Sequence, residues 1–335
     1  MRDILLFSCH WRGTGLTNQL FLIICGIIKC INEKIKVLIL SDMLIDIDKE
    51  SHDKVSNIID IFYLNEILVE YDIKVYDIND VNFRVQEILY GSDMNKIDIT
   101  DKIIEKYMSD NCLYIPSNIS LNDIAGDPDV GTFKKLYIKY NIKDTTLTEI
   151  HNEYYRETIY FDKKILFTFT DWEKDIEPHV GTEIFLRLLK KIRFIDKYIN
   201  ETDMFYNKLN FNKINVVHLR VEFDMIYRMD SNNMWELKEK IETSYIDMIK
   251  ENIQKDELTI VLTYDLNNNV INYLKENGYN YFYTEKKYPE REYNAIIDFL
   301  IGERCNNIFI GFPNSTYSYS LEKRINNVKS MYISI

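Results

Sequence analysis

The chain has 335 residues, of which 46% are hydrophobic, and carries a formal net charge of -12. A chain of this length can hold two ordinary domains, each with its own core. The acidic balance and the lack of any block of Lys and Arg argue against a nucleic acid as partner, but a compact anion held by one or two arginines remains compatible with the sequence.

The cysteines and the most apolar segment indicate where in the cell the protein is located. Five cysteines are scattered without C-x-x-C spacing, so we expect reduced, mostly buried thiols rather than a zinc site or a disulfide framework. The segment LFLIICGII at 20–28 is shorter than a membrane span and does not follow a basic region. We therefore expect a soluble cytoplasmic protein with no signal peptide and no transmembrane segment.

The first 42 residues indicate a strand, a loop, a helix and a second strand. DILLFSCH at 3–10 and KVLILSD at 36–42 are apolar runs typical of buried parallel strands. Residues 18–31 between them have the length and apolar content of a helix. This order predicts a βαβ unit of the doubly wound α/β class.

The loop between the first strand and the helix has the features of an anion site. Gly13 and Gly15 let the backbone approach a ligand, and the amides at the start of the helix are free to donate. The loop lacks the Lys and Ser or Thr of a P-loop, and Asn18 stands where a dinucleotide fingerprint needs a third glycine. An ordinary tight turn capped by Thr17 or Asn18 explains the loop equally well.

The rest of the chain divides by pattern. Residues 1–150 are predicted to form an N-terminal Rossmann-like domain, although 43–150 show no clear order of elements. Residues 151–211 are charged and helical in pattern, as in a connector. Residues 212–335 alternate strands and helices, which predicts a second Rossmann-like domain whose sheet faces the first across a cleft. The predicted strands are 214–221, 258–265, 279–285 and 307–312, and the predicted helices are 244–254, 268–278 and 293–305.

The stretch NVVHLRVEFDM at 215–225 places an ionisable residue at every second position. A half-buried strand would show this alternation. In a sheet covered on both faces, however, such residues are costly unless they emerge at a strand end that opens into a site. Arg220 would then clamp a diphosphate, Glu222 or Asp224 could act as general base, and His218 could hydrogen-bond the leaving phosphate or pack structurally.

A third candidate strand end is NIFIGFPNSTYSYS at 307–320. The strand is predicted to end at Pro313, and Asn314, Ser315 and Thr316 then supply short polar donors at the start of a helix. Such donors suit a phosphate or sugar hydroxyls, but an ordinary helix N-cap needs the same residues. Two D-x-D pairs occur elsewhere in the chain, no more than chance gives for this aspartate content, so we predict no metal site.

Together these stretches resemble the GDP-fucose-dependent fucosyltransferase superfamily, which includes bacterial α-1,2-fucosyltransferases, protein O-fucosyltransferases and the plant O-fucosyltransferase-like proteins. The family's G-x-G-N-Q-type loop is similar to Gly13–Gln19, with Thr17 where Gly is usual. Its H-x-R motif matches His218 and Arg220. The longer HLRVEFDM is similar to the plant form, whereas the bacterial form has a second arginine where Val221 stands.

Two further motifs extend the resemblance over residues 5–25 and 214–324. CNNIFIGFPNSTYSYS is similar to the family's C-terminal C-x-x-x-I-x-x-x-N-S-T-F-S-W-W pattern. VLTYD is similar to a family strand end that carries a carboxylate, which corresponds to Asp265. The resemblance implies a GT-B-like fold of two Rossmann-like domains, with the nucleotide held mainly by the C-terminal domain and the acceptor on the N-terminal side.

The resemblance also implies an activity, namely inverting, metal-independent transfer of L-fucose from GDP-fucose to a hydroxyl of a glycan or protein acceptor. Arg220 would bind the β-phosphate, Ser315 and Thr316 the diphosphate, Asp265 the guanosine part and Asn18 the sugar or phosphate. No cofactor is expected beyond the donor sugar nucleotide. A rhamnosyl or xylosyl donor, or a non-catalytic protein that binds a nucleotide sugar or glycan, is the alternative. The sequence does not indicate the acceptor, the linkage or the oligomeric state.

Overall fold

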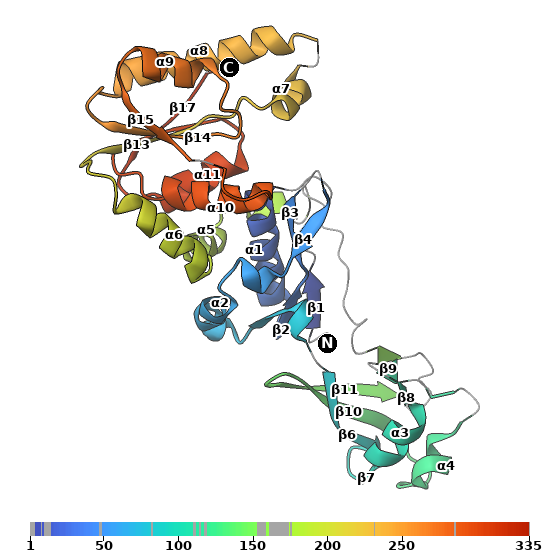
Figure 1. Ribbon diagram of the computed structural model, residues 1–335. Coiled ribbons are helices and arrows are strands. Elements are labelled where there is room, and N and C mark those ends of the chain that lie inside the picture. The colour runs from blue at the N-terminus through green and yellow to red at the C-terminus, as the bar shows by residue number, and fades with distance from the viewer. Residues whose placement is uncertain are drawn as a thin grey trace. The chain divides into compact units, whose positions relative to one another are not determined.

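The computed structural model describes residues 4–7, 9, 15–46, 49–81, 83–109, 112–113, 115–116, 119–152, 159–160, 174, 176–230, 232–284 and 286–334. The chain forms two compact units (Figure 1). The N-terminal unit comprises Met1–Ser8, Gly26–Asp42 and Ile61–Thr170, and the C-terminal unit comprises Cys9–Cys25, Met43–Asp60 and Asp171–Ile335. The division predicted from the sequence, at residues 150 and 211, stays a prediction.

The first two strands and the helix between them form the predicted βαβ unit, and residues 16–25 of that helix are counted with the C-terminal unit. Strands β1 (Ile4–Phe7) and β2 (Val37–Leu40) pair in parallel, and β5 (Lys74–Asp77) extends the sheet in the order β1-β2-β5. Helix α1 (Leu16–Glu33) connects β1 to β2. All four residues of β2 are buried, as expected for the middle strand of a parallel sheet. The predicted order of strand, helix and strand is therefore confirmed.

Residues 83–152, whose elements the sequence did not order, contain an antiparallel sheet. It runs in the order β11-β10-β6-β7 and belongs to the N-terminal unit. Its strands are β6 (Phe83–Gly91), β7 (Lys96–Asp98), β10 (Lys135–Ile142) and β11 (Thr145–Asn152). The remaining elements of the unit are α2 (Ile61–Leu68), α3 (Thr100–Tyr107), α4 (Leu121–Ala125), β8 (Met108–Ser109), β9 (Cys112–Leu113), β12 (Ile159–Tyr160) and the 3₁₀ helices Val69–Tyr71 and Ile78–Asp80.

The C-terminal unit is built on a five-stranded sheet in which every pair of neighbours is parallel. Its order is β15-β14-β13-β16-β17, so the chain fills one side of β13 first and then crosses to the other. The strand order reverses between β13 and β16. In doubly wound sheets, ligands bind in the crevice at this point, outside the carboxyl ends of the strands. The strands are β13 (Ile214–His218), β14 (Leu258–Leu262), β15 (Asn280–Tyr283), β16 (Ile308–Gly311) and β17 (Lys329–Tyr332).

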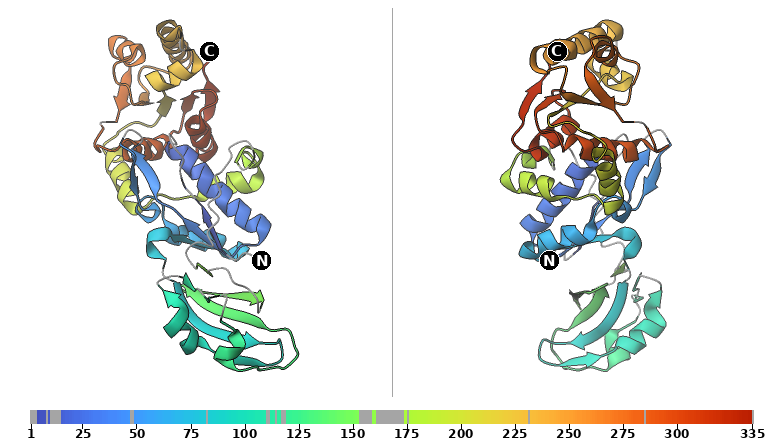
Figure 2. Two further views of the ribbon diagram at one scale, coloured as in Figure 1. Left: turned by 90° about the vertical axis from the view of Figure 1, so that its right-hand side faces the viewer. Right: turned by 60° about the vertical axis from the view of Figure 1, so that its left-hand side comes forward.

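Helices cover both faces of this sheet. Figure 1 shows α8 and α9 on one face and α10 and α11 on the other, and Figure 2 shows the same arrangement from two further sides. Their bounds are α8 (Met234–Asn252), α9 (Asn269–Glu276), α10 (Arg291–Gly302) and α11 (Thr316–Arg324). The unit also contains β3 (Met43–Asp46), β4 (Ser51–Asp53), α5 (Glu183–Lys191), α6 (Asp196–Tyr206), α7 (Phe223–Met229) and the 3₁₀ helices Val55–Asn57 and Glu177–His179.

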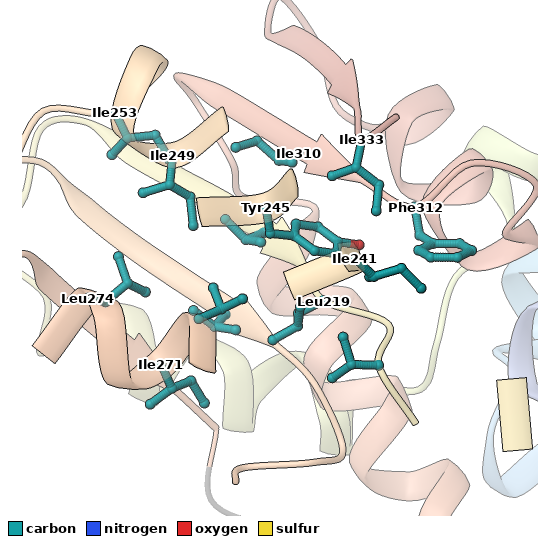
Figure 3. Close-up of a cluster of buried hydrophobic side chains, with 14 of the residues drawn as sticks. Leu219, Ile241, Tyr245, Ile249, Ile253, Ile271, Leu274, Ile310, Phe312 and Ile333 are labelled. Carbon is teal, nitrogen blue, oxygen red and sulfur yellow. The ribbon is translucent and has the colours of Figure 1, made fainter. Parts of the chain in front are cut away.

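The core between the sheet and α8 and α9 is closely packed (Figure 3). Ile249 of α8, Leu274 of α9 and Ile310 of β16 are fully buried there. Tyr245 of α8 is also buried, and its hydroxyl donates to the backbone oxygen of His218 at 2.7 Å. This bond fixes the end of β13, the strand that leads into the site described below.

Helix α1 has the length and apolar content of a membrane span. In the structure 72% of it is buried inside the protein. A buried core helix can have the same length and apolar content as a membrane span. The predicted apolar segment 20–28 is thus part of a longer buried helix. The cytoplasmic location stays a prediction.

Candidate functional site

A cavity of about 320 Å³ opens in the C-terminal unit where β13 and β16 end. Its walls come from the start of α1, the loop after β13, the end of β14, α10 and the start of α11. This is the crevice that the strand order marks as the ligand site. Of the residues predicted from the sequence, it is lined by Gly15, Asn18, His218, Arg220, Glu222 and Thr316.

The alternation of buried apolar and ionisable residues in HLRVEFDM continues past the end of the strand. The predicted strand 214–221 is shorter in the structure, since β13 ends at His218. Leu219 and Val221 remain buried, while Arg220 and Glu222 line the cavity. Asp224 lies in α7, and its side chain is outside the part of the chain that the structure describes.

His218 is held as a neutral ring at the cavity wall. Its Nδ1 lies 2.6 Å from Ser318 Oγ, which also accepts the backbone N–H of Phe312 at 2.8 Å. In the tautomer with the ring proton on Nε2, Nδ1 accepts the hydroxyl proton of Ser318. In the other tautomer Nδ1–H donates to Ser318 Oγ, because a hydroxyl oxygen can accept two hydrogen bonds. Burial, with Arg220 nearby, lowers the pKa of His218 to about 3. The ring also stacks on Tyr317 with 4.5 Å between centroids.

Arg220 and Asn18 bring buried polar atoms without partners to the cavity. Arg220 Nε lies 3.9 Å from Glu222 Oε2. Within the described part of the chain, neither Arg220 Nε nor Asn18 Oδ1 has a hydrogen-bond partner, although both atoms are buried. Buried polar atoms are almost always satisfied in proteins, so these two indicate that a ligand completes the site.

The glycine-bearing loop leads into a helix that is capped from a distance. Helix α1 begins at Leu16, so the alternative in which Thr17 or Asn18 is the N-cap is wrong. The backbone N–H of Leu16 donates instead to Glu292 Oε2 of α10 at 2.7 Å, a partner 276 positions away in sequence. Gly15 lines the cavity, whereas Gly13 lies outside the described residues.

The segment after β16 combines both of its predicted roles. Ser315 is the N-cap of α11, since its side chain accepts from Ser318 N. Thr316 lines the cavity, and its Oγ1 lies 3.1 Å from Thr17 Oγ1 at the start of α1. Asn314, with a left-handed φ of 59°, makes the turn into the helix. Neither Asn314 nor Ser315 is part of the cavity wall.

The structure also places Asp265 away from the cavity wall. Its Oδ2 lies 3.0 Å from Lys238 Nζ, and its Oδ1 accepts from the backbone of Asn267 at 2.9 Å. The residues of this strand end that line the cavity are Leu262, Thr263 and Tyr264.

Sequence reasoning missed the contribution of α10. Glu292 and Asp298 line the cavity from this helix and are 4% and 6% exposed. Burial raises the pKa of Glu292 to about 7, against the opposing effect of Arg291 and of the bond from Leu16 N. Burial also raises the pKa of Asp298, which binds Thr284 Oγ1 and Lys286 Nζ. The local signal is that two carboxylates stand inside the largely apolar helix EYNAIIDFLIG. Their spacing of six residues places them about 120° apart around the axis rather than on one face, so helical periodicity does not pair them.

No protein-family model matches the chain, and no curated protein matches it. Solved structures do. POFUT1 in complex with GDP-fucose has a TM-score of 0.51 and 12% sequence identity, over 100% of this chain and 98% of that chain. POFUT1 in complex with GDP has a TM-score of 0.53 and 12% identity, over 100% and 99%. The fucosyltransferase NodZ from Bradyrhizobium has a TM-score of 0.46 and 10% identity, over 98% and 95%.

The likeness to POFUT1 extends over the whole chain, so the predicted α/β, GT-B-like fold class is confirmed. Among the described residues, no group of three or more His, Cys, Asp or Glu side chains could hold a metal ion. The predictions that the protein uses no metal and no cofactor remain untested.

Proposed function

We propose that this protein is a glycosyltransferase that transfers L-fucose from GDP-fucose to a hydroxyl of a glycan or protein acceptor, with inversion and without a metal ion. The observation that carries the proposal is the cavity at the ends of β13 and β16, where Arg220, neutral His218 and Asn18 converge. The same fold in POFUT1 has been solved with GDP-fucose.

The proposed chemistry follows from the donors at the cavity wall. The guanidinium of Arg220 would stabilise the negative charge that develops on the departing diphosphate, and so would His218 in the tautomer with its proton on Nε2. Thr316 Oγ1, at the start of α11, adds a short donor on the same wall. A neutral His218 suits this role because its proton stays in place across the physiological pH range. Glu222 or Asp224 stays the candidate base predicted from the sequence.

The two ends of the cavity differ in chemistry, which gives the donor a direction. Glu292 and Asp298 are six residues apart on α10, or about 9 Å along its axis. Arg220 acts electrostatically on Glu292, whereas Lys286 acts on Asp298. We therefore assign the phosphates and the sugar to the Glu292 end and the nucleoside to the Asp298 end. Tyr264, 55% exposed, also lines the cavity, and its ring centroid lies 5.4 Å from Cζ of Arg291, the residue next to Glu292.

Calorimetry with GDP, GDP-fucose, UDP and ADP tests the proposal. We expect GDP and GDP-fucose to bind, and Arg220→Ala to weaken both, while Arg84→Ala, at an exposed position of β6, leaves them unchanged. Binding of none of the four ligands would refute the proposal. Binding of UDP without GDP would move the donor to another nucleotide sugar. Binding of GDP-fucose without release of GDP in the presence of any acceptor, water included, would favour the non-catalytic alternative.

A further inference from the structure

The carboxylate of Glu292 lines the cavity and has one oxygen held by a hydrogen bond. Oε2 accepts the backbone N–H of Leu16 at 2.7 Å, which holds the side chain in one orientation. Both oxygens would lie 3.9 Å from a Cβ added at Gly15, so the absence of a side chain there keeps the carboxylate uncovered. No described residue hydrogen-bonds Oε1, and Glu292 lines the cavity. The free oxygen can therefore accept a proton from a bound molecule.

The charges around Glu292 come from several elements. Arg291 on its own helix and Arg220 after β13 favour the ionised form, whereas Asp46 of β3 opposes it. Among the described residues, Tyr317 of α11 also interacts with Glu292 electrostatically. Burial outweighs these effects and brings the pKa to about 7. A base of this strength can both take up and release a proton near neutral pH.

Glu222, the other described carboxylate proposed as base, is placed differently. Its Oε2 lies 3.9 Å from Arg220 Nε, so it forms an ion pair with the residue proposed to clamp the diphosphate. A carboxylate in that position orients the guanidinium. Within the described residues no ion pair involves Glu292. Its carboxylate is therefore not neutralised by a contacting Lys or Arg side chain among them.

We infer that Glu292 is the general base that accepts the proton of the acceptor hydroxyl, an inference that rests on the proposed function. In the step, the acceptor oxygen forms a bond to the anomeric carbon, and the bond from that carbon to the β-phosphate oxygen breaks. The electron pair of the broken bond leaves with GDP, and the hydroxyl proton passes to Glu292 Oε1. With water as acceptor the same step gives fucose and GDP, which allows a test before the natural acceptor is known.

The experiment measures GDP release from GDP-fucose in water between pH 5.5 and 8.5. Glu292→Gln is the informative variant, because an amide oxygen can still accept the bond from Leu16 N but cannot take up a proton. Glu222→Gln is the comparison, and calorimetry with GDP reports on the donor site in each protein. We expect kcat/KM of the wild type to rise as pH increases through about 7. We expect Glu292→Gln to lose at least about 100-fold in kcat, to lack this pH dependence, and to bind GDP within about 3-fold of the wild type.

The outcomes separate this inference from the proposed function. Turnover by Glu292→Gln near the wild-type rate would mean that Glu292 only caps α1 and would overturn the inference. Loss of GDP binding together with turnover would assign Glu292 to donor binding and overturn it as well. A wild-type protein that binds neither GDP nor GDP-fucose would instead refute the proposed function itself.

Discussion

Replacing Glu292 by Gln should change how the stability of the protein depends on pH. The pKa of this carboxyl is about 7 in the folded protein against an ordinary 4.5, so between these values the folded state holds a proton that the unfolded state has released. The free energy of unfolding then falls as pH rises through this window. At about 1.4 kcal/mol for each pH unit, the loss is about 3 kcal/mol, complete above pH 7. Glutamine does not titrate and removes this loss.

Thermal unfolding followed by circular dichroism at pH 5 and pH 8 measures the effect. About 2.5 kcal/mol of this loss falls between pH 5 and pH 8, because pH 5 already lies above the ordinary pKa. This corresponds to about 5–10 °C for a domain of ordinary size. We expect the melting temperature of Glu292→Gln, relative to the wild type, to rise by this amount between the two pH values. Subtracting the wild type cancels the titration of all other groups, and Glu239→Gln, at an exposed position of α8, controls for the change of side chain. Parallel pH dependences of Glu292→Gln and the wild type would refute the reasoning.

Three further substitutions test the site and its support. Arg220→Ala should lower GDP release from GDP-fucose by about 10²–10³-fold, the usual cost of a lost donor to developing charge, with an unchanged melting temperature; near wild-type turnover would exclude Arg220 as the clamp. Ser318→Ala leaves Phe312 N–H and His218 Nδ1 without their partner, so we expect about 1–3 kcal/mol less stability in denaturant unfolding and slower turnover. Gly302→Ala would put a Cβ 2.9 Å from Leu321 Cδ2. We expect this overpacking to lower the free energy of unfolding by about 1–3 kcal/mol in the same measurement. A variant as stable as the wild type would contradict this prediction.

The fold could be predicted where burial on both faces of a sheet leaves a continuous apolar run. The strands at 214, 258 and 308 and the first βαβ unit have such runs, and all four were found. The antiparallel sheet in 83–152 was not, because its strands are covered unevenly: β11 alternates exposed and partly buried residues. The edge strand β17 (KSMY) has exposed and partly buried residues throughout and carries no apolar run.

The site was predictable at strand ends and much less so on helices. His218 ends a buried strand, Arg220 and Thr316 follow buried strands, and all three line the cavity. Asp265 also follows a strand, but Lys238 of α8 holds its carboxylate, and a contact between elements so far apart cannot be read from local pattern. Glu292 was missed for the same reason, because its partner is the first amide of a helix 276 positions earlier.

The two departures from the family motifs have structural explanations that bear on the non-catalytic alternative. Thr17 stands where the family has glycine, yet its Oγ1 lies 3.1 Å from Thr316 Oγ1, so it joins the first motif to the last across the cavity wall. Val221 stands where the bacterial form has a second arginine, and it is 1% exposed in the core beneath α8. An arginine there would bring a charge into the apolar cluster to which Val221 belongs, which is costly without a buried counter-charge. Both residues fit the packing around an intact Arg220, so neither departure is evidence that the site has degenerated.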